Sequence, residues 1–254
     1  MPEDRPPASD TGCYLYGVVP LGSSRPSLQG IDGAEVAYVE HGELAAAVTE
    51  MTLDRPPGRR AELMAHTGVV DSLAASGPVL PMQFGSVVED RDSVVNDVLA
   101  PSHDRFVELL AHLAGSRQLN LRATYVEDQV LGEIVGTRPD IADLHRRTRT
   151  LPAGTMHPDL VRLGELVSHA LEQRRDVDAE AVLEVVRPFV RDEAIRNGGG
   201  VDHLLELALL VENERIPDLE EALETFAEAV HERVRLRLTG PVAPYDFAEA
   251  GAWG

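Results

Sequence analysis

The first half of the chain contains short apolar segments separated by turn residues. Residues 14–19 form a continuous apolar run that ends at Pro20, and residues 36–39 and 44–48 flank His41-Gly42. Apolar runs of this length that end at turn residues are typical of buried strands, and two such runs around a short turn predict a hairpin. We therefore predict a fold that begins at Cys13 with a strand and a hairpin. Residues 1–12 are rich in Pro, Asp and other residues that disfavour regular structure, and are predicted to be disordered.

Helical periodicity follows this hairpin. Residues 59–75 place apolar side chains on one helical face, and residues 94–99 and 106–113 give two more such stripes, separated by Pro101. Residues 79–85 between them are strand-like, but proline has no backbone N–H, so Pro81 restricts this segment to a sheet edge or an irregular position. The sequence therefore predicts an α+β N-terminal domain over residues 13–116.

The second half opens and closes with alternating patterns. Residues 118–123 and 234–238 alternate apolar and polar positions, which is the signature of half-buried strands, and the context favours a further strand at 204–211. Helical stripes follow Pro158, Asp178 and Pro217. The order is strand, helices, strand, strand, helix, strand, which is that of a ferredoxin-like fold. We predict an α+β protein whose ferredoxin-like C-terminal domain covers residues 117–239 and is followed by a tail, residues 240–254.

Composition narrows the classes of function. The chain has 254 residues, and 23 basic against 43 acidic side chains give a net charge of −20, which disfavours nucleic acid and anionic membranes as partners. All basic residues are Arg, so P-loop and Schiff-base lysine chemistries are excluded. Cys13 is the single cysteine, and the most apolar stretch, 204–211, is too short to span a membrane. A cytoplasmic protein is expected.

Candidate chemistry is sparse. Glu62 and His66 lie four residues apart on a predicted helix and are the nearest pair of possible metal ligands, but no third ligand accompanies them. A solvated or capping contact is the simpler interpretation of this pair. HExxH, G-x-S-x-G and G-x-G-x-x-G motifs do not occur in the sequence. We therefore expect no catalytic residues, no metal and no cofactor.

Two segments, residues 78–86 and 238–247, combine Pro, Gly and aromatic residues in a chain with few aromatic residues. This combination suggests fixed backbone geometry and apolar docking. The candidate partner-binding or domain-docking residues are Leu80, Pro81, Met82, Phe84, Pro241, Pro244, Tyr245 and Phe247. The alternative is that the first segment is a core strand and the second is a tail packed on its own domain.

The same two segments, in order with others, resemble the gas vesicle protein F/L family. The matching segments are residues 14–19, 44–48, 66–70, 79–86, 207–211 and 240–247, so the resemblance spans nearly the whole chain. The family motif Val-Leu-Pro-Leu-Arg-Phe-Gly-Thr corresponds to residues 79–86, and Gly-Pro-x-Pro-Pro-Tyr-x-Phe corresponds to 240–247. Gln83, Ser86 and Ala243 depart from these motifs, and Gln83 removes the positive charge that the family usually has there.

The resemblance implies a non-enzymatic accessory protein of gas vesicle assembly. Members associate with the small, very hydrophobic shell-forming gas vesicle protein A and with other accessory proteins, as minor structural, nucleating or chaperone-like components. Localisation in the cytoplasm and at the gas vesicle is implied. The alternatives are an enzyme or small-ligand-binding regulator on a ferredoxin-like scaffold, and a regulatory interaction protein with no place in the vesicle.

Two structural expectations complete the sequence analysis. Residues 240–247 are expected to be ordered and docked, and disorder is expected beyond Ala248. The N-terminal domain is expected to contact the shell protein through apolar and backbone interactions, because acidic residues are concentrated between 212 and 228 in the other half and Pro81 leaves a sheet edge.

Overall fold

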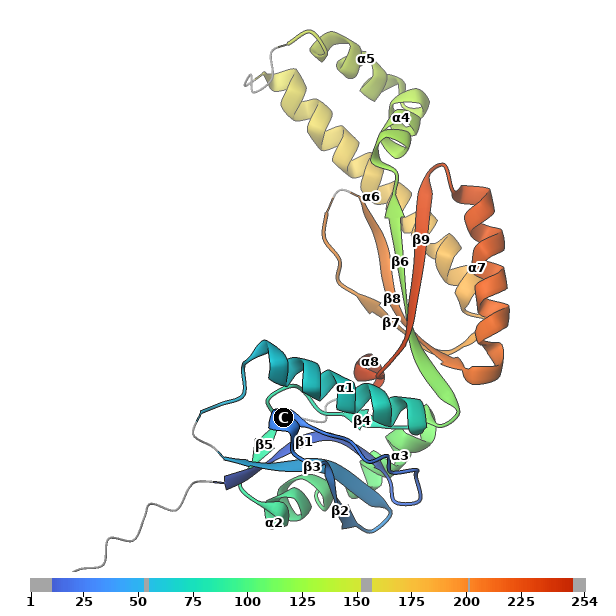
Figure 1. Ribbon diagram of the computed structural model, residues 1–254. Helices are drawn as coiled ribbons and strands as arrows, with labels where there is room; N and C mark the ends of the chain where they lie inside the picture. Colours follow the sequence, from blue (N-terminus) through green and yellow to red (C-terminus); the bar gives the residue numbers. More distant parts are fainter. Residues whose placement is uncertain (1–10, 53–54, 152–156, 201, 249–254) are drawn as a thin grey trace, which may run out of the picture. The chain divides into compact units, whose positions relative to one another are not determined.

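The computed structural model describes residues 11–52, 55–151, 157–200 and 202–248. The chain forms two compact units, one made of residues 1–118 together with 241–254 and the other of residues 119–240. The chain passes from one unit to the other in strand β6 (Ser116–Tyr125) and returns in strand β9 (Val234–Val242). The architecture is mixed α and β, with one sheet in each unit (Figure 1).

The sheet of the first unit is centred on strand β1 (Thr11–Pro20). The strand order is β2-β3-β1-β4, with β5 also paired to β1. The other strands are β2 (Ala37–His41), β3 (Leu44–Thr52), β4 (Leu80–Pro81) and β5 (Val87–Val88). The predicted hairpin is confirmed, because β2 pairs antiparallel with β3 and Gly42 in their turn has φ +57°, a left-handed conformation that glycine adopts without strain.

Helices surround this sheet. Helix α1 (Arg60–Ser76) contacts β1 and provides His66, Val69, Val70 and Leu73 to the core. The remaining elements of the unit are η1 (Ile31–Gly33), α2 (Arg91–Ser93), the π-helix η2 (Val94–Leu99), α3 (His103–Leu113) and the C-terminal α8 (Tyr245–Ala248). The buried aromatic side chains Tyr14, Tyr16 and Phe106 are among the largest in this unit.

The second unit has a sheet of strand order β7-β8-β6-β9. Strand β7 (Val190–Arg196) pairs antiparallel with β8 (His203–Glu212), which follows it along the chain. The helices are α4 (Glu127–Thr137), α5 (Pro139–Thr148), α6 (Pro158–Val186) and α7 (Ile216–Val230), with the short η3 (Asn213–Arg215) before α7. Leucine and valine side chains from β6, β8, α6 and α7 form its core.

Two sequence-based boundaries were wrong. The first strand begins at Thr11 rather than Cys13, because Thr11 pairs with Thr52 of β3 and Gly12 pairs with Met51. Residues 1–10, the rest of the predicted disordered segment, lie outside the described residues. The two helices predicted after Pro158 and Asp178 are one helix of 29 residues.

Asp178 explains the second error. A helix start was predicted at this residue, but Asp178 lies in the interior of α6. No proline follows Pro158 in this helix, so nothing breaks it near Asp178. Its buried carboxylate accepts hydrogen bonds from Tyr125 (3.0 Å), Arg174 (3.1 Å) and Arg233 (3.0 Å). The acid therefore connects α6 to the sheet instead of capping a helix.

We expect Gly17→Ala to destabilise the protein, because β1 and β4 approach closely at this residue. A Cβ on Gly17 would lie 2.9 Å from the Leu80 carbonyl oxygen and from a Val79 methyl group. Overpacking of this kind costs about 1–3 kcal/mol of unfolding free energy, measurable by urea denaturation. The control is Gly68→Ala in α1, where nothing lies within 4 Å and the change should stabilise the helix by up to about 1 kcal/mol. Equal effects of the two variants would contradict the close approach.

Candidate functional site

The first proline-aromatic segment crosses the edge of the first sheet. Leu80 and Pro81 pair with Val18 and Gly17 of β1, and the Met82 N–H donates to the Tyr16 carbonyl oxygen at 2.9 Å. Leu80, Pro81 and Met82 are buried. Phe84 is half-buried and packs on the core of the unit.

The second segment ends against the first. Helix α8 contacts β4, and Ala243, Pro244 and Phe247 are buried, whereas Pro241 is exposed. The Gln118 side-chain amide donates to the Asp246 carboxylate at 2.6 Å, and the Asp246 backbone N–H donates back to the side-chain oxygen Oε1 of Gln118 at 3.3 Å. These contacts order the tail up to the last described residue, Ala248.

His66 joins the two segments. Its side chain is 2% exposed and contacts a tyrosine hydroxyl at each ring nitrogen: Nδ1 lies 2.9 Å from Tyr14 Oη and Nε2 lies 3.1 Å from Tyr245 Oη. Tyr14 Oη also accepts the Gly85 N–H at 3.0 Å. The Phe84 ring meets the imidazole edge to face at 5.7 Å. We call this set, Tyr14, His66, Phe84 and Tyr245, the tyrosine-histidine junction.

One neutral tautomer of His66 satisfies all the hydrogen bonds of the junction. In this tautomer Tyr14 Oη accepts from Gly85 and donates its own proton to His66 Nδ1, and the imidazole hydrogen lies on Nε2, toward Tyr245 Oη. Burial lowers the pKa of His66, so the ring is held neutral, and burial raises the pKa of Tyr14 and of Tyr245 to about 12. At neutral pH the junction is an uncharged hydrogen-bonded chain between four segments of the unit.

Tyr16 extends this aromatic cluster. Its ring stacks on His66 at 5.8 Å, and its hydroxyl donates to Thr49 Oγ1 at 3.0 Å while accepting the Ile31 N–H at 2.9 Å. The hydroxyl therefore supports the loop before β2 in addition to the sheet. Burial raises the pKa of Tyr16.

Glu62 has a capping role, as the simpler interpretation of its spacing from His66 predicts. Its carboxylate accepts the backbone N–H groups of Gly58 and Arg59 at 2.8 Å each and pairs with the Arg55 guanidinium. These donors, the Arg55 side chain first, lower the pKa of Glu62 to about 2. Both His66 nitrogens are hydrogen-bonded to tyrosines, so Glu62 and His66 each have structural partners within the first unit. Among the described residues, no three His, Cys, Asp or Glu side chains are grouped as a metal site would require.

The eight predicted site residues thus lie in one unit, but not as one exposed surface. Leu80, Met82 and Phe247 fill its interior, and Pro241 is exposed at the start of the tail. Their role toward a partner stays a prediction. Sequence reasoning missed Tyr14 and Tyr16 as site residues, although their separation by two positions in a strand puts both rings on one face of the sheet.

Sequence reasoning also missed a groove in the second unit. It is lined by residues of β6, α7 and β9, and two glutamates lie at its rim. A concentration of acidic residues on a helix normally indicates a solvated face, so the sequence alone does not point to this groove.

The two sheets, the docked tail and the neutral junction define a protein of mixed α and β structure, in which the tyrosine-histidine junction is a structural joint between segments of the first unit. The chain belongs to the family described as gas vesicle synthesis protein GvpL/GvpF, whose model matches residues 12–249. This confirms the resemblance seen in the sequence motifs. Among the helices of the described residues, none has both the length and the apolar content to cross a membrane.

Individual relatives agree with this assignment. The chain is 33% identical to gas vesicle protein F of Streptomyces sp. (strain CB03234), over 93% of this chain and 99% of the relative. It is 27% identical to gas vesicle protein L1 of Halobacterium salinarum, over 93% and 90%. The crystal structure of GvpF from Anabaena sp. PCC7120 has the same fold, with a TM-score of 0.83 at 24% identity, covering 95% of this chain and 99% of that one.

We expect removal of residues 240–254 to destabilise the first unit. The deletion withdraws Phe247, which is 7% exposed, and leaves His66 Nε2 without its tyrosine partner. Loss of one buried aromatic side chain costs about 1.5–3 kcal/mol, so the melting temperature should fall by several degrees. Deletion of residues 249–254 alone is the control and should leave the melting temperature unchanged. An unchanged melting temperature in the longer deletion would count against docking.

Stability should also depend on pH through His66. Below pH ~6.5 the imidazole binds a proton in the unfolded chain but not in the folded one, because burial lowers its folded pKa. The unfolding free energy is therefore expected to be constant above pH ~6.5 and to fall as pH decreases, by at most about 1.4 kcal/mol per pH unit.

Urea denaturation of the wild type and His66→Gln between pH 7.5 and 5 measures this effect. Glutamine keeps a donor and an acceptor but does not titrate, so its curve should be flatter. Glu62 does not interfere in this pH range. The stability that its lowered pKa contributes is lost only when the pH falls below the usual pKa of a carboxyl group. Parallel pH curves for the two proteins would show that His66 is not the group responsible.

Proposed function

We propose that the chain acts in gas vesicle assembly by binding the hydrophobic shell protein, gas vesicle protein A, as a minor structural, nucleating or chaperone-like component in the cytoplasm and at the vesicle. Membership of the gas vesicle synthesis family supports the process, and the names of the relatives support partners among gas vesicle proteins. A net charge of −20 suits a carrier of an insoluble subunit, because it keeps the complex in solution. No enzymatic step is part of this proposal.

The exposed face of helix α1 carries the proposal. Leu63 and Met64 are 44% and 62% exposed, and Thr67 and Gly68 continue the same face one turn later. These four exposed positions on one helix face carry no charge, on a chain in which a quarter of the residues are charged. This surface suits an apolar partner and replaces the Pro81–Phe84 edge as the contact region that we propose, since Leu80, Pro81 and Met82 are buried.

We further propose that the protein has two domains. Residues 119–240 form a ferredoxin-like domain, and the first unit forms the other domain. The chain order β6, helices, β7, β8, α7, β9 and the spatial order β7-β8-β6-β9 support this description. In this arrangement the proposed contact with the shell protein belongs to the first unit, because the exposed apolar face lies on its helix α1.

A co-expression pulldown with the shell protein tests the contact. The double variant Leu63→Ser/Met64→Ser should capture several-fold less shell protein than the wild type, because it removes the apolar surface without disturbing buried residues. The control is Val161→Ser/Val177→Ser in α6, which removes two side chains that are 54% and 66% exposed in the other unit.

Capture should persist at raised salt, because apolar contacts are not screened. Loss of capture in the α6 variant but not in the α1 variant, or loss at moderate salt, would overturn the proposed contact. Failure of the wild type to capture the shell protein would overturn the function itself.

A further inference from the structure

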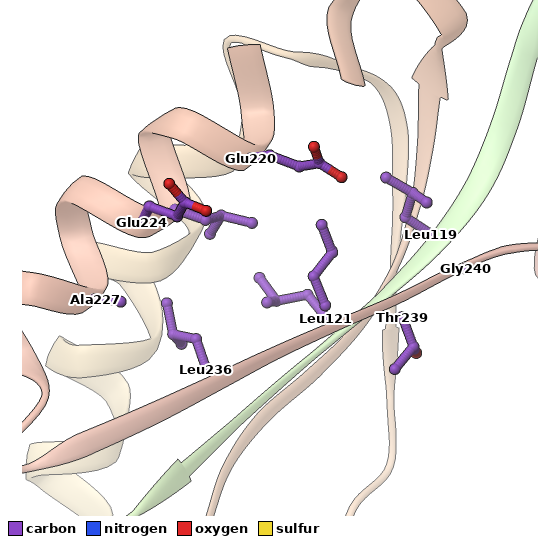
Figure 2. Close-up of a pocket in the computed structure, with 10 residues that line it drawn as sticks. Leu119, Leu121, Glu220, Glu224, Ala227, Leu236, Thr239 and Gly240 are labelled. Carbon is purple, nitrogen blue, oxygen red and sulfur yellow. The ribbon is translucent and has the colours of Figure 1, made fainter. Parts of the chain in front are cut away.

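A groove of about 320 Å³ runs between helix α7 and the end of the second sheet (Figure 2). Its floor is apolar and consists of Leu119 and Leu121 of β6 with Leu236 and Leu238 of β9. The carboxylates of Glu220 and Glu224 extend over this floor from α7. Leu119 and Leu121 are buried, whereas Leu236 and Leu238 keep part of their surface exposed. The volume is at the lower end of the ~300–1,000 Å³ typical of ligand sites.

The groove opens toward the free edge of the sheet. Strand β9 is the last in the order β7-β8-β6-β9, so one of its edges has no neighbouring strand in the described sheet. Glu221 and Thr225 of α7 line a different hollow. Its other wall contains Val185, in the last turn of α6, and Phe189, just after this helix. Glu220, Glu224 and Ala227 lie on the opposite side of α7, since residues three and four apart share a side of a helix. This side faces β9.

The charges around the groove are unbalanced. Glu220 and Glu224 are one helical turn apart, which is unfavourable for like charges, and within the described residues neither carboxylate has an ion-pair partner. The other face of the same strand has an excess of basic side chains: Arg237 lines a hollow with Arg122 and Arg196, and Glu206 pairs with Arg196 there. Strand β9 thus separates an apolar, acidic side from a basic side.

We propose that β9 and this groove bind an extended segment of a partner protein by adding a strand to the sheet. Backbone groups of the segment pair with the free edge of β9, and alternate side chains enter the groove. On the groove side the segment carries apolar residues and an Arg or Lys two positions away, whose aliphatic stem packs on leucine while its charge reaches Glu220 and Glu224. On the opposite side, next to Arg235 and Arg237, it carries acidic residues.

This proposal identifies a second binding surface and does not depend on the shell-protein contact at α1. A segment that carries an Arg or Lys fits the groove better than a purely apolar segment. Without a cation from the segment, the carboxylates at the rim would lose hydration and gain no partner. A uniformly basic segment is also disfavoured, since half of its side chains would face Arg235 and Arg237.

Two fluorescein-labelled peptides of reversed charge pattern test the proposal by fluorescence anisotropy with the full chain. In Thr-Leu-Glu-Arg-Glu-Leu-Thr the two leucines and the Arg share one side of an extended chain and the two Glu the other. In Thr-Leu-Arg-Glu-Arg-Leu-Thr the charges are exchanged, which gives one net positive instead of one net negative charge. We expect the first peptide to bind more tightly, although nonspecific attraction to a chain of charge −20 favours the second.

Matched variants locate the site. Glu220→Gln/Glu224→Gln should weaken binding of the first peptide about fivefold, whereas Glu214→Gln/Glu221→Gln, with the same change in net charge away from the groove side of α7, should not. Ala227→Trp fills the groove and should abolish binding, whereas Ala229→Trp, outside it on the same helix, should not. Circular dichroism confirms that each variant is folded, and Leu63→Ser/Met64→Ser should bind the peptide normally.

Three outcomes would overturn the proposal. Tighter or equal binding of the charge-exchanged peptide, equal effects of the two Glu→Gln pairs, or no binding of either peptide at millimolar concentration would each do so. Sedimentation equilibrium of the chain alone adds a fourth. If the wild type forms a dimer that Ala227→Trp abolishes, the groove is occupied by a second copy instead of a partner segment.

Discussion

The burial of one imidazole between two tyrosine hydroxyls is the constraint on which the first unit depends. A buried polar ring is costly unless both of its nitrogens have partners, and His66 finds them in Tyr14 near the start of the chain and Tyr245 near its end. The hydrogen bond of His66 Nε2 to Tyr245 therefore forms only when the C-terminal tail packs on the first unit. Phe84 meets the imidazole edge to face and Tyr16 stacks on it, so aromatic surface adjoins these hydrogen bonds.

This constraint gives the chain its order. Residues 119–240 are inserted, along the sequence, between two parts of one unit, and Gln118 and Asp246 hydrogen-bond across the point where the chain leaves and returns. The first unit therefore cannot complete its core during synthesis until the second has been made. Contacts between residues this far apart in sequence carry a loop-closure cost, which the buried Ala243 and Phe247 offset.

Prediction from sequence succeeded where one strong local signal determines an element. The hairpin around Gly42, helix α1 and strand β9 follow from period and turn residues alone. It failed where distant residues decide. Asp178 has the properties of a helix cap in the sequence, but it lies inside a helix and accepts hydrogen bonds from Tyr125 and Arg233, which are 53 and 55 positions away. His66 was considered as a metal ligand because its tyrosine partners are 52 and 179 positions away.

The groove was missed for a related reason. A helix with many glutamates is normally explained by solvation, and the sequence does not say which of them project over a sheet edge. Helical spacing separates Glu220 and Glu224 from Glu221, but only the packing of α6 beside α7 shows which side is left open. The groove glutamates therefore differ from the buried acids. Glu62 and Asp178 are buried and paired within the fold, whereas Glu220 and Glu224 have no ion-pair partner among the described residues and lie beside partly exposed leucine surface, where a partner's cation would gain most.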